Sequence, residues 1–274
     1  MGNADQSTLQ AFDAKWGNRW KGRSDAAHDL RIFQSFFSLF PFAELTKGEG
    51  FDLGCGVGRH AAMVAPRVSK IHCIDPSPNA LGAAREALAG QDNAEFHLAD
   101  VDHIPLADGS QDFGFSMGVL HHTPDTEAAL RRCVAKLKPG APFLLYLYYR
   151  FDDRPLWFRA IWKASDVARR LICRLPIRSR KWATDAVAVS VYWPLSRLAL
   201  LLERSGRNVA NLPLSFYRRT PMRGLKVSSY DRLATPLEQR FTRPEIERMM
   251  LRSGLTDIRF QQHEPYWVAL GRRG

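Results

Sequence analysis

The stretch Phe51-Asp-Leu-Gly-Cys-Gly-Val-Gly-Arg59 decides the fold of this chain. Gly54, Gly56 and Gly58 form a G-x-G-x-G turn between a short apolar run and helix-like sequence. Glycines at a strand–loop–helix turn let a ligand approach the backbone closely. A second apolar run ends in Asp75, 17 residues after Gly58. That interval is close to the roughly 20-residue offset at which an acidic side chain accepts from ribose hydroxyls, so the sequence predicts a nucleoside-containing cofactor.

The glycine spacing separates two classes of nucleoside cofactor. The third glycine is the fifth residue of the loop, so the dinucleotide fingerprint G-x-G-x-x-G is missed by one residue. Asp52 precedes the first glycine by two residues, where its carboxylate would organise the loop and face a cofactor's ammonium group. A third apolar run leads to Asp100, which is placed to accept a hydrogen bond from an adenine amino group. These features favour S-adenosylmethionine over a dinucleotide such as NAD.

Residues 50–150 resemble the class I S-adenosylmethionine-dependent methyltransferases, in particular the small-molecule, methyltransferase type 11-like group with a DLGCGxG loop. Three further segments match that family in the expected order: Ile104–Phe113, Gly118–His122 and the turn Leu137–Gly140. Ala141 stands where the family usually has a second glycine. The resemblance implies metal-independent, in-line methyl transfer to a small or amphipathic acceptor, with O- or N-methylation favoured.

The spacing and the resemblance together give a set of residues that are expected to bind the cofactor. They are Asp52, Gly54, Cys55, Gly56, Gly58, Arg59, Asp75, Pro76, Asp100, Val101, Met117 and Trp16. Trp16 shares one face of an N-terminal helical segment with Phe12 and Trp20. In the resembling family such a segment often covers the cofactor; the alternative is that these aromatic residues anchor a helix to the core. Cys55 is interpreted as a small residue that fits the loop, in preference to a nucleophile.

Three residues are candidates for catalysis. Methyl transfer from a sulfonium needs chiefly alignment and exclusion of water, but an acceptor whose pKa exceeds the working pH also needs a base. His121 and His122 follow the fourth predicted strand, and because adjacent side chains diverge, at most one is expected to face the acceptor. Tyr148 ends the fifth predicted strand on the same face as Tyr146. For each of these residues, packing is the alternative role.

Several sequence features that would indicate other chemistry are missing. The end of the fourth predicted strand has neither the Asp/Asn-Pro-Pro-aromatic motif for base amines nor a Pro-Cys nucleophile, and no acidic cluster indicates a magnesium site. The four cysteines, at positions 55, 73, 133 and 173, lack the spacing of a zinc site or a disulfide framework. The first residues show no signal-peptide pattern, so a cytoplasmic location is expected.

The alternation of strand and helix patterns from Gly50 to Tyr149 predicts parallel βαβ units with helices on both faces of one sheet. A capping box at Thr242 and Glu245 and a terminating Gly254 predict one more helix. The fold class is therefore α/β: a Rossmann-like, seven-stranded methyltransferase sheet with an antiparallel last strand. The expected strands are Gly50–Leu53, Ile71–Asp75, Ala94–Leu98, Phe113–Met117, Phe143–Tyr148, Leu255–Gln261 and Tyr266–Leu270.

A mainly helical insertion is expected before that last helix. The predicted domains are an N-terminal helical cap at 1–45, a cofactor-binding core at 46–150 and 241–274, and an acceptor lid at 151–240. The insertion carries 18 Lys and Arg against 7 Asp and Glu, whereas the rest of the chain has 21 of each and is neutral. Two long helices are expected in 154–205, with Pro194 starting, kinking or breaking the second, and 208–240 is expected to be irregular.

The insertion leaves the acceptor open. It is interpreted as a solvated lid, as a site for an acidic acceptor, or as a contact with an anionic membrane or a lipid-linked acceptor. Nucleic acid is disfavoured because no RNA-binding module accompanies the charge. No transmembrane segment is expected, because Pro194 and Arg197 interrupt the most apolar run, Ala186–Leu202, although peripheral membrane contact fits. A catalytically silent cofactor-binding protein is the alternative to an enzyme.

Overall fold

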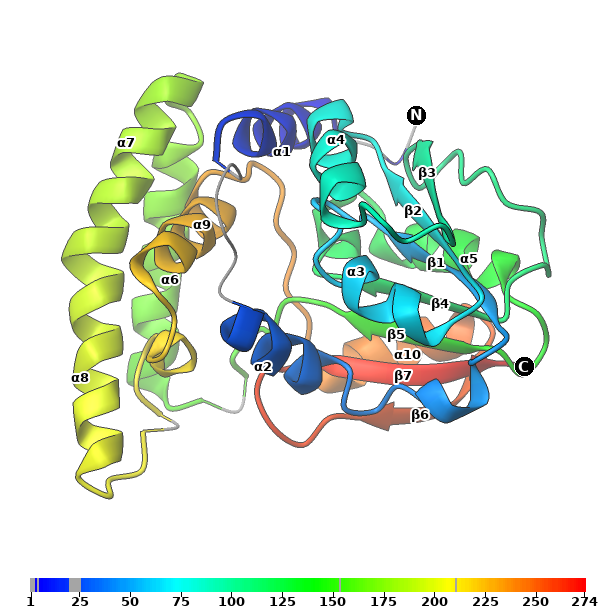
Figure 1. Cartoon of the computed structure of the whole chain (residues 1–274). Helices are drawn as coiled ribbons and strands as arrows, with labels where there is room; N and C mark the ends of the chain where they lie inside the picture. The colour runs from blue at the N-terminus through cyan, green and yellow to red at the C-terminus, as the bar shows by residue number, and fades with distance from the viewer. Residues whose placement is uncertain (1–2, 4, 20–25, 153, 210) are drawn as a thin grey trace. The chain divides into compact units, whose positions relative to one another are not determined.

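The computed structural model describes residues 3, 5–19, 26–152, 154–209 and 211–274. The chain divides into two compact units: unit 1 comprises residues 1–150 and 237–274, and unit 2 comprises residues 151–236. Figure 1 shows the elements of both units along the chain.

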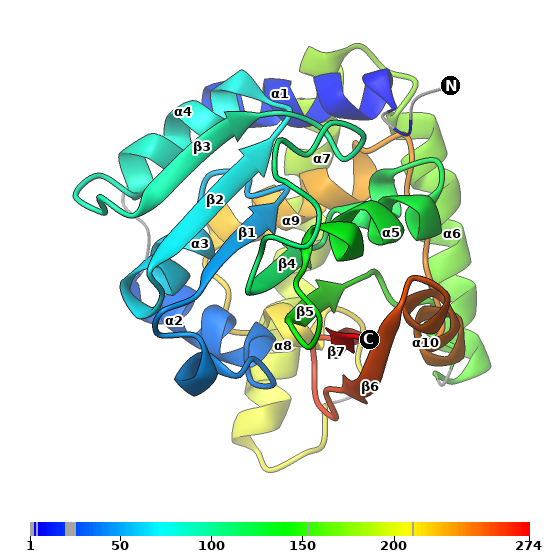
Figure 2. The same cartoon turned by 90° about the vertical axis from the view of Figure 1, so that its right-hand side faces the viewer.

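Unit 1 is built on a seven-stranded sheet in the order β3-β2-β1-β4-β5-β7-β6 (Figure 2). Strands β1 to β5 pair in parallel, and β7 pairs antiparallel with both β5 and β6. The predicted fold class, including the antiparallel last strand, is confirmed. The strands are β1 Glu49–Leu53, β2 Lys70–Asp75, β3 Ala94–Leu98, β4 Phe113–Met117, β5 Pro142–Tyr146, β6 Leu255–Phe260 and β7 Val268–Arg273.

Helices cover both faces of this sheet, as the alternation predicts. Phe51 and Phe143 pack with α5 (Thr126–Lys136) and α10 (Arg243–Arg252) on one face. Ile71 and Phe115 pack on the other face with α2, α3 and α4. Successive residues of a strand point to opposite faces, which is how the buried central strands supply both layers of the core. The remaining helical elements are α1 Gln6–Arg19, α2 Ala26–Phe36, η1 Phe42–Glu44, α3 Ala61–Val64, η2 Ala65–Arg67, α4 Pro78–Ala87 and η3 Leu120–His122.

Side-chain caps mark where α4, α5 and α10 begin. The Thr242 hydroxyl and the Glu245 carboxylate form the predicted capping box of α10, and Gly254 after that helix has a φ of +89°. Ser77 caps α4 and also donates to Asp13 of α1 at 2.5 Å, which ties these helices side by side (Figure 1). Each cap satisfies backbone N–H groups that the first turn leaves without partners.

The end of β5 and both ends of β7 differ from the prediction by two or three residues, and the other strand ends agree with it to within one residue. β5 ends at Tyr146, because beyond it the chain leaves the ladder and Tyr149 forms an isolated bridge with Phe241. β7 begins at Val268 and extends to Arg273, where Arg273 pairs with Leu255 at the start of β6. The apolar pattern alone therefore predicts the ends of β5 and β7 to within three residues.

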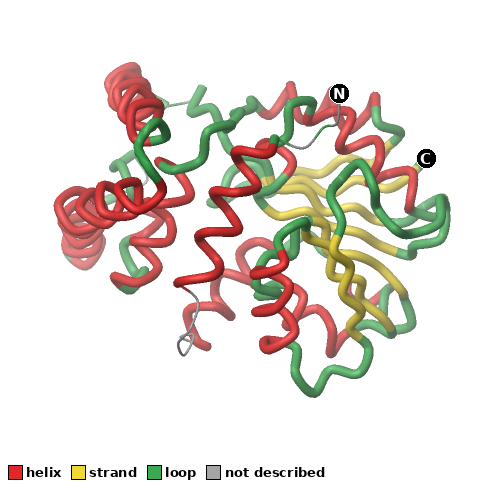
Figure 3. Tube along the Cα trace, turned by 90° about the horizontal axis from the view of Figure 1, so that it is seen from above, coloured by secondary structure: helices red, strands yellow, loops and turns green. Residues whose placement is uncertain are grey.

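Unit 2 consists of helices and loops in its described part (Figure 3). The helices are α6 Leu156–Ile172, α7 Ile177–Val187, the π-helical turn η4 Ala188–Tyr192, α8 Trp193–Arg204, η5 Ser215–Tyr217 and α9 Met222–Leu233. The expectation that 208–240 is irregular is wrong for α9. This helix packs against α6, α7 and η4 and buries Leu225 and Tyr230, so tertiary contacts stabilise a segment whose own pattern is weak.

Pro194 lies in the first turn of α8, which is one of the predicted alternatives, but it does not end the longer helical run. The wide turn η4 precedes it, and α7, η4 and α8 run on as one helix, Ile177–Arg204. Proline lacks an N–H, and a π turn relaxes the hydrogen-bond ladder around such a residue. Among the described residues this one helix is long and apolar enough to cross a membrane, which corrects the expectation that Pro194 and Arg197 interrupt such a run.

Candidate active site

The glycine loop follows β1, and its conformation requires glycine. Gly54, Gly56 and Gly58 have φ values of +75°, +55° and +72°. A Cβ atom at Gly54 would lie 2.4 Å from Cγ2 of Val119, and one at Gly58 would lie 2.6 Å from Cδ1 of Leu88. Positive φ and close packing together leave no room for another residue type, so the loop presents its backbone at the carboxyl end of the sheet.

Asp75 holds this loop in place. Its Oδ2 accepts from the backbone N–H of Gly56 at 2.9 Å, and its Oδ1 accepts from the N–H of Ser77 at 2.9 Å. One carboxylate thus joins the end of β2, the glycine loop and the start of α4. The sequence predicts a role in binding ribose; the structure adds this supporting role, which spacing does not reveal.

Asp52 is a buried carboxyl group without full hydrogen bonding. The residue is 2% exposed, and its Oδ2 has no hydrogen-bond partner among the residues that the structure describes. Burial, and secondarily the charge of Asp75, raise the pKa of Asp52 well above its ordinary value. A cation beside Oδ2 would stabilise the ionised form, so this position fits a positively charged ligand group.

Asp100 and Val101, which are also predicted to bind the cofactor, follow β3. Oδ1 of Asp100 accepts from the N–H of Asp102 at 3.0 Å and lies 2.8 Å from Nδ1 of His103. Val101, the next residue, is buried in the core. Asp100 itself is partly exposed at the edge of the sheet, so its carboxylate is accessible to a ligand.

The remaining predicted cofactor residues surround the loop with different exposures. Hydrogen bonding with Cys73, followed by burial, raises the pKa of the Cys55 thiol well above its ordinary value, which agrees with a packing role. Nε of Arg59 lies 3.8 Å from Asp29 Oδ1. Pro76 and Met117 are partly exposed at the carboxyl ends of β2 and β4. The side chain of Trp16 lies outside the described residues, and so does Trp20.

The three candidate catalytic residues form one aromatic cluster. The rings of His121 and Tyr148 lie 3.8 Å apart, those of His121 and His122 lie 4.1 Å apart, and those of His122 and Tyr148 lie 5.7 Å apart. The expectation that the two histidines diverge is therefore wrong, because the tight turn η3 turns both rings onto Tyr148. Tyr146 lies 5.9 Å from Tyr148, on the same side as the strand alternation predicts.

The two histidines differ in hydrogen bonding. Nδ1–H of His122 donates to the Leu237 carbonyl at 2.7 Å, which fixes its tautomer. His121 is fully buried, and within the described part of the chain neither of its ring nitrogens has a hydrogen-bond partner. Burial, followed by the nearby charges of His122 and Arg240, lowers the pKa of His121 well below 6.5. His121 is therefore a neutral imidazole, and no described residue competes with a ligand for its ring nitrogens.

Residues 237–240, which we call the strap, complete this cluster. Gln239 donates its backbone N–H to the His121 carbonyl at 2.9 Å and its side-chain N–H to the Thr123 carbonyl at 2.6 Å. The Arg240 guanidinium lies 5.4 Å from the centroid of Tyr148. No local pattern in the sequence signals that the strap residues return to the end of β4.

The N-terminal segment reaches the same end of the sheet. The Phe12 ring meets the His122 ring edge-on at a centroid distance of 5.1 Å. Asn3 exchanges hydrogen bonds of 2.7 Å with the backbone of Asp125, the N-cap of α5. The start of the chain thus packs beside the candidate catalytic residues.

The buried His121 is expected to make the stability of the protein depend on pH. The unfolded chain protonates this histidine near its ordinary pKa of about 6.5, whereas the folded chain does so at a much lower pH. As the pH falls below about 6.5, His121 lowers the free energy of unfolding by up to about 1.4 kcal/mol per pH unit. Asp52 acts in the opposite direction because its folded-state pKa is raised. The contribution of His121 is therefore measured as the difference in the pH dependence of stability between a His121 variant and the unmodified protein.

We expect His121→Phe to lose less stability than the unmodified protein between about pH 7 and about pH 5. Urea unfolding followed by circular dichroism measures this difference. Tyr148→Phe changes the same cluster without removing an imidazole, so its pH dependence should match that of the unmodified protein. An equal loss in His121→Phe would mean that the folded protein protonates this ring.

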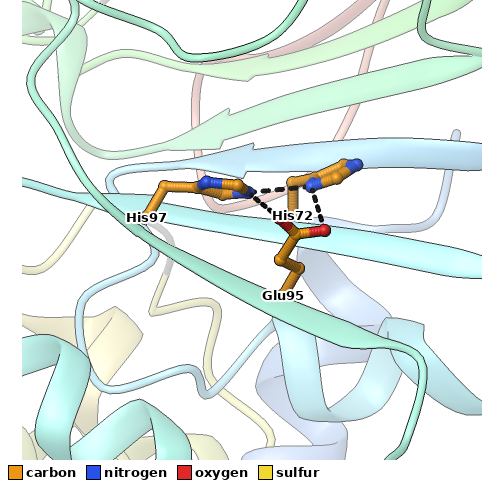
Figure 4. A group of neighbouring side chains, drawn as sticks. All are labelled: His72, Glu95 and His97. Carbon is orange, nitrogen blue, oxygen red and sulfur yellow. Dashed lines mark hydrogen bonds and ion pairs between the residues drawn. The ribbon is translucent and has the colours of Figure 1, made fainter.

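A second polar cluster lies across β2 and β3 (Figure 4). Nδ1 of His72 lies 2.9 Å from Nε2 of His97, and Nε2 of His72 lies 2.7 Å from Oε1 of Glu49. The ligand atoms of His72, Glu95 and His97 are close enough to hold a metal ion. However, Lys70 contacts Glu95 at 2.8 Å, and this hydrogen bond raises the pKa of Lys70 and lowers that of Glu95. The cation of Lys70 already compensates the carboxylate, so we interpret the cluster as a cross-strand polar network.

Residues 51–145 match the family model described as a methyltransferase domain. This range contains the glycine loop, Asp75, Asp100 and both histidines of the aromatic cluster. Residues 51–145 form a methyltransferase domain with the class I fold.

Curated relatives of this methyltransferase domain act on both nitrogen and oxygen, to judge by their names. The chain is 28% identical to phosphoethanolamine N-methyltransferase 2 of Caenorhabditis elegans over 143 residues, which is 51% of this chain and 32% of the relative. It is 29% identical to the ubiquinone biosynthesis O-methyltransferase of Xanthomonas oryzae pv. oryzae strain PXO99A over 149 residues, or 53% and 62% of the two chains. The match thus spans less than two thirds of either relative.

A solved structure shares the fold. An O-methyltransferase family protein from Burkholderia thailandensis superposes with a TM-score of 0.53 at 15% sequence identity, covering 90% of this chain and 56% of the other. At this level of identity the likeness supports the arrangement of the elements.

Proposed function

We propose that the chain transfers the methyl group of S-adenosylmethionine to an oxygen or nitrogen atom of a small or amphipathic acceptor, without a metal ion. The observation that carries the proposal is the buried Asp52 carboxyl, whose Oδ2 has no hydrogen-bond partner among the described residues. Asp52 directly precedes the glycine loop, which Asp75 holds in place by accepting from the Gly56 N–H. Oδ2 of Asp52 would hold the ammonium group of the cofactor, which would supply the missing cation. The family match over residues 51–145 supports the same cofactor.

Different residues around the glycine loop bind different parts of the cofactor. The glycine backbone lets the cofactor approach, and Asp75 and Asp100 offer oxygens to its ribose hydroxyls and its adenine amino group. Oδ2 of Asp52 would accept hydrogen bonds from the ammonium group. When bound, the cofactor supplies an electrophilic methyl group on a sulfonium, so no leaving group needs a proton.

The aromatic cluster provides the acceptor side of the reaction. The neutral His121 takes the proton that the acceptor O–H or N–H loses as its lone pair forms the new bond to carbon. Tyr148 packs against the His121 ring at 3.8 Å and holds its orientation, and the strap covers both residues. Both histidines are buried, which keeps water away from the acceptor side of the site.

The experiment is a methyl-transfer assay with S-adenosylmethionine and a panel of acceptors with free amines, phosphoamines and catechol hydroxyls, read by mass spectrometry. We expect formation of S-adenosylhomocysteine together with one methylated product. His121→Asn should lower kcat by about 100- to 10,000-fold with little change in cofactor affinity. His263→Asn, at an exposed ring, is the matched control and should retain activity. Tight cofactor binding without turnover of any acceptor would favour a silent binding protein instead.

A further inference from the structure

Unit 2 contains a helix whose two faces are reversed relative to a water-soluble helix. In Ile177–Arg204 the inner face buries mostly small residues, including Thr184, Ala188, Ser196 and Ala199. α7 and η4 pack against α9, and the Ser229 hydroxyl donates to the Thr184 carbonyl at 2.8 Å. The large apolar side chains lie on the opposite, exposed side. In a water-soluble helix the large apolar residues would be the buried ones.

We call this exposed side the outer face and define it by Trp182, Val189, Trp193, Leu195, Leu198 and Leu201. Trp182 is 79% exposed and Leu201 is 61% exposed. Of the most apolar 18-residue window of the helix, 22% is buried inside the protein, so this is not a core helix. A continuous apolar surface of this kind marks an interaction site.

The π turn η4 keeps the two faces separate along the helix. Residues at four-residue spacing drift by about 40° per step around an α-helix of 3.6 residues per turn. The wider turn at Ala188–Tyr192 offsets this drift, so that Thr184, Ala188, Tyr192 and Ser196 all remain buried. The outer face is consequently uninterrupted from α7 to α8.

Polar groups near the outer face are satisfied within unit 2. Between Asp185 and Glu203 the sequence has one charged residue, Arg197, and its guanidinium donates to the Arg218 and Thr220 carbonyls at 2.8 and 2.7 Å. The exposed Ser190 hydroxyl donates to the Ala186 carbonyl at 2.8 Å. Such internal hydrogen bonds allow a helix to enter an apolar medium. Residues 186–202 thus give an uncharged outer face about 26 Å long.

Charge identifies what covers this face. Basic residues flank the apolar stretch at both ends, with exposed Arg178 and Lys181 before it and exposed Arg204 and Arg207 after it. Residues 151–240 carry the whole net positive charge of the chain. A second copy of the chain would bring like charges together, whereas anionic lipid headgroups neutralise them. Exposed tryptophan and leucine beside lysine and arginine form the composition of helices that lie in the membrane interface.

We propose that the outer face of Ile177–Arg204 is a membrane-binding surface. It lies in the boundary between headgroups and acyl chains of an anionic bilayer, with the basic residues at both ends in contact with lipid phosphates. The helix does not span the bilayer, because its inner face is packed against α9 of the same unit. This inference does not depend on the proposed methyl transfer.

The test is flotation of the purified whole chain with vesicles of phosphatidylcholine, with and without phosphatidylglycerol, in the absence of cofactor. We expect binding to the vesicles that contain phosphatidylglycerol, and weaker binding at high salt because the charge attraction is screened. The double variant Leu198→Glu, Leu201→Glu should bind at least about 100-fold more weakly, since it places two charges in the apolar layer. The matched control Leu98→Glu, Leu251→Glu changes two exposed leucines of unit 1 and should bind as the unmodified protein does.

Three results would overturn the proposal: no flotation of the folded protein, unchanged flotation of the Leu198→Glu, Leu201→Glu variant, or a dimer that this variant dissociates while vesicles capture neither form. The third result would assign the outer face to a second copy. Circular dichroism of every variant establishes that it is folded. Because no methyl transfer is measured, the result stands apart from that of the acceptor assay.

Discussion

Asp75→Asn is expected to weaken S-adenosylmethionine binding by about 100- to 1,000-fold. The Asp75 carboxylate accepts from the N–H groups of Gly56 and Ser77 at 2.9 Å each. An asparagine side chain can accept with its oxygen from one of them, and its NH2 group then faces the other donor. A hydrogen bond to a charged group contributes about 1.5–3 kcal/mol, and the glycine loop loses its anchor in addition. Isothermal titration calorimetry measures the affinity.

The control for this variant is Asp108→Asn. Asp108 is an exposed carboxylate that contacts Lys136 at 2.7 Å, and exposed pairs contribute about 1 kcal/mol or less. Its replacement should leave the cofactor affinity within about twofold of that of the unmodified protein. If Asp75→Asn bound S-adenosylmethionine as tightly as this control, Asp75 would have no role in organising the site.

Arg240→Met is expected to lower the free energy of unfolding by about 3–5 kcal/mol. The Arg240 guanidinium lies 2.7 Å from Glu238, and the two side chains are only 9% and 4% exposed. Oε2 of Glu238 has no hydrogen-bond partner among the residues given by the structure, so removal of the arginine leaves a buried carboxylate without compensation. Methionine keeps most of the apolar stem, so the loss reports on the ion pair together with the hydrogen bond that Nη1 of Arg240 donates to the Tyr149 carbonyl at 3.1 Å. Urea unfolding measures it.

Arg252→Met tests whether burial is the cause. Arg252 pairs with Glu127 at 2.6 Å, but its side chain is 57% exposed. We expect a loss of about 1 kcal/mol or less, because solvent screens such a pair. Adding Glu238→Gln to Arg240→Met should restore part of the stability, since the uncompensated charge is removed. Equal losses at Arg240 and Arg252 would mean that the strap is not held by a buried ion pair.

The sheet could be predicted because its strands are buried on both faces. Parallel strands covered by helices appear in sequence as short apolar runs bounded by turn residues. Ala94–Leu98 and Phe113–Met117 were predicted with their observed bounds. The start of α10 was equally predictable, because Thr242 and Glu245 satisfy the first turn through contacts three residues apart.

The features that escaped prediction depend on contacts between distant residues. α9 buries Ser229 together with Leu225 and Tyr230, so packing on its neighbours decides its conformation. The strap reaches His121 across more than a hundred residues of sequence. The hydrogen bonds of Asp75 and the lack of a partner at Asp52 Oδ2 likewise depend on three-dimensional position. The residue types of the site could therefore be predicted from the sequence, whereas the contacts between them are seen only in the structure.

A calorimetric titration of the purified protein with S-adenosylmethionine, S-adenosylhomocysteine and NAD decides which cofactor the glycine loop binds. The buried Asp52, the glycine loop and the family match predict micromolar binding of the first two ligands and no binding of NAD. A folded protein that binds neither S-adenosylmethionine nor S-adenosylhomocysteine, or that binds NAD in their place, would contradict the proposed methyl transfer.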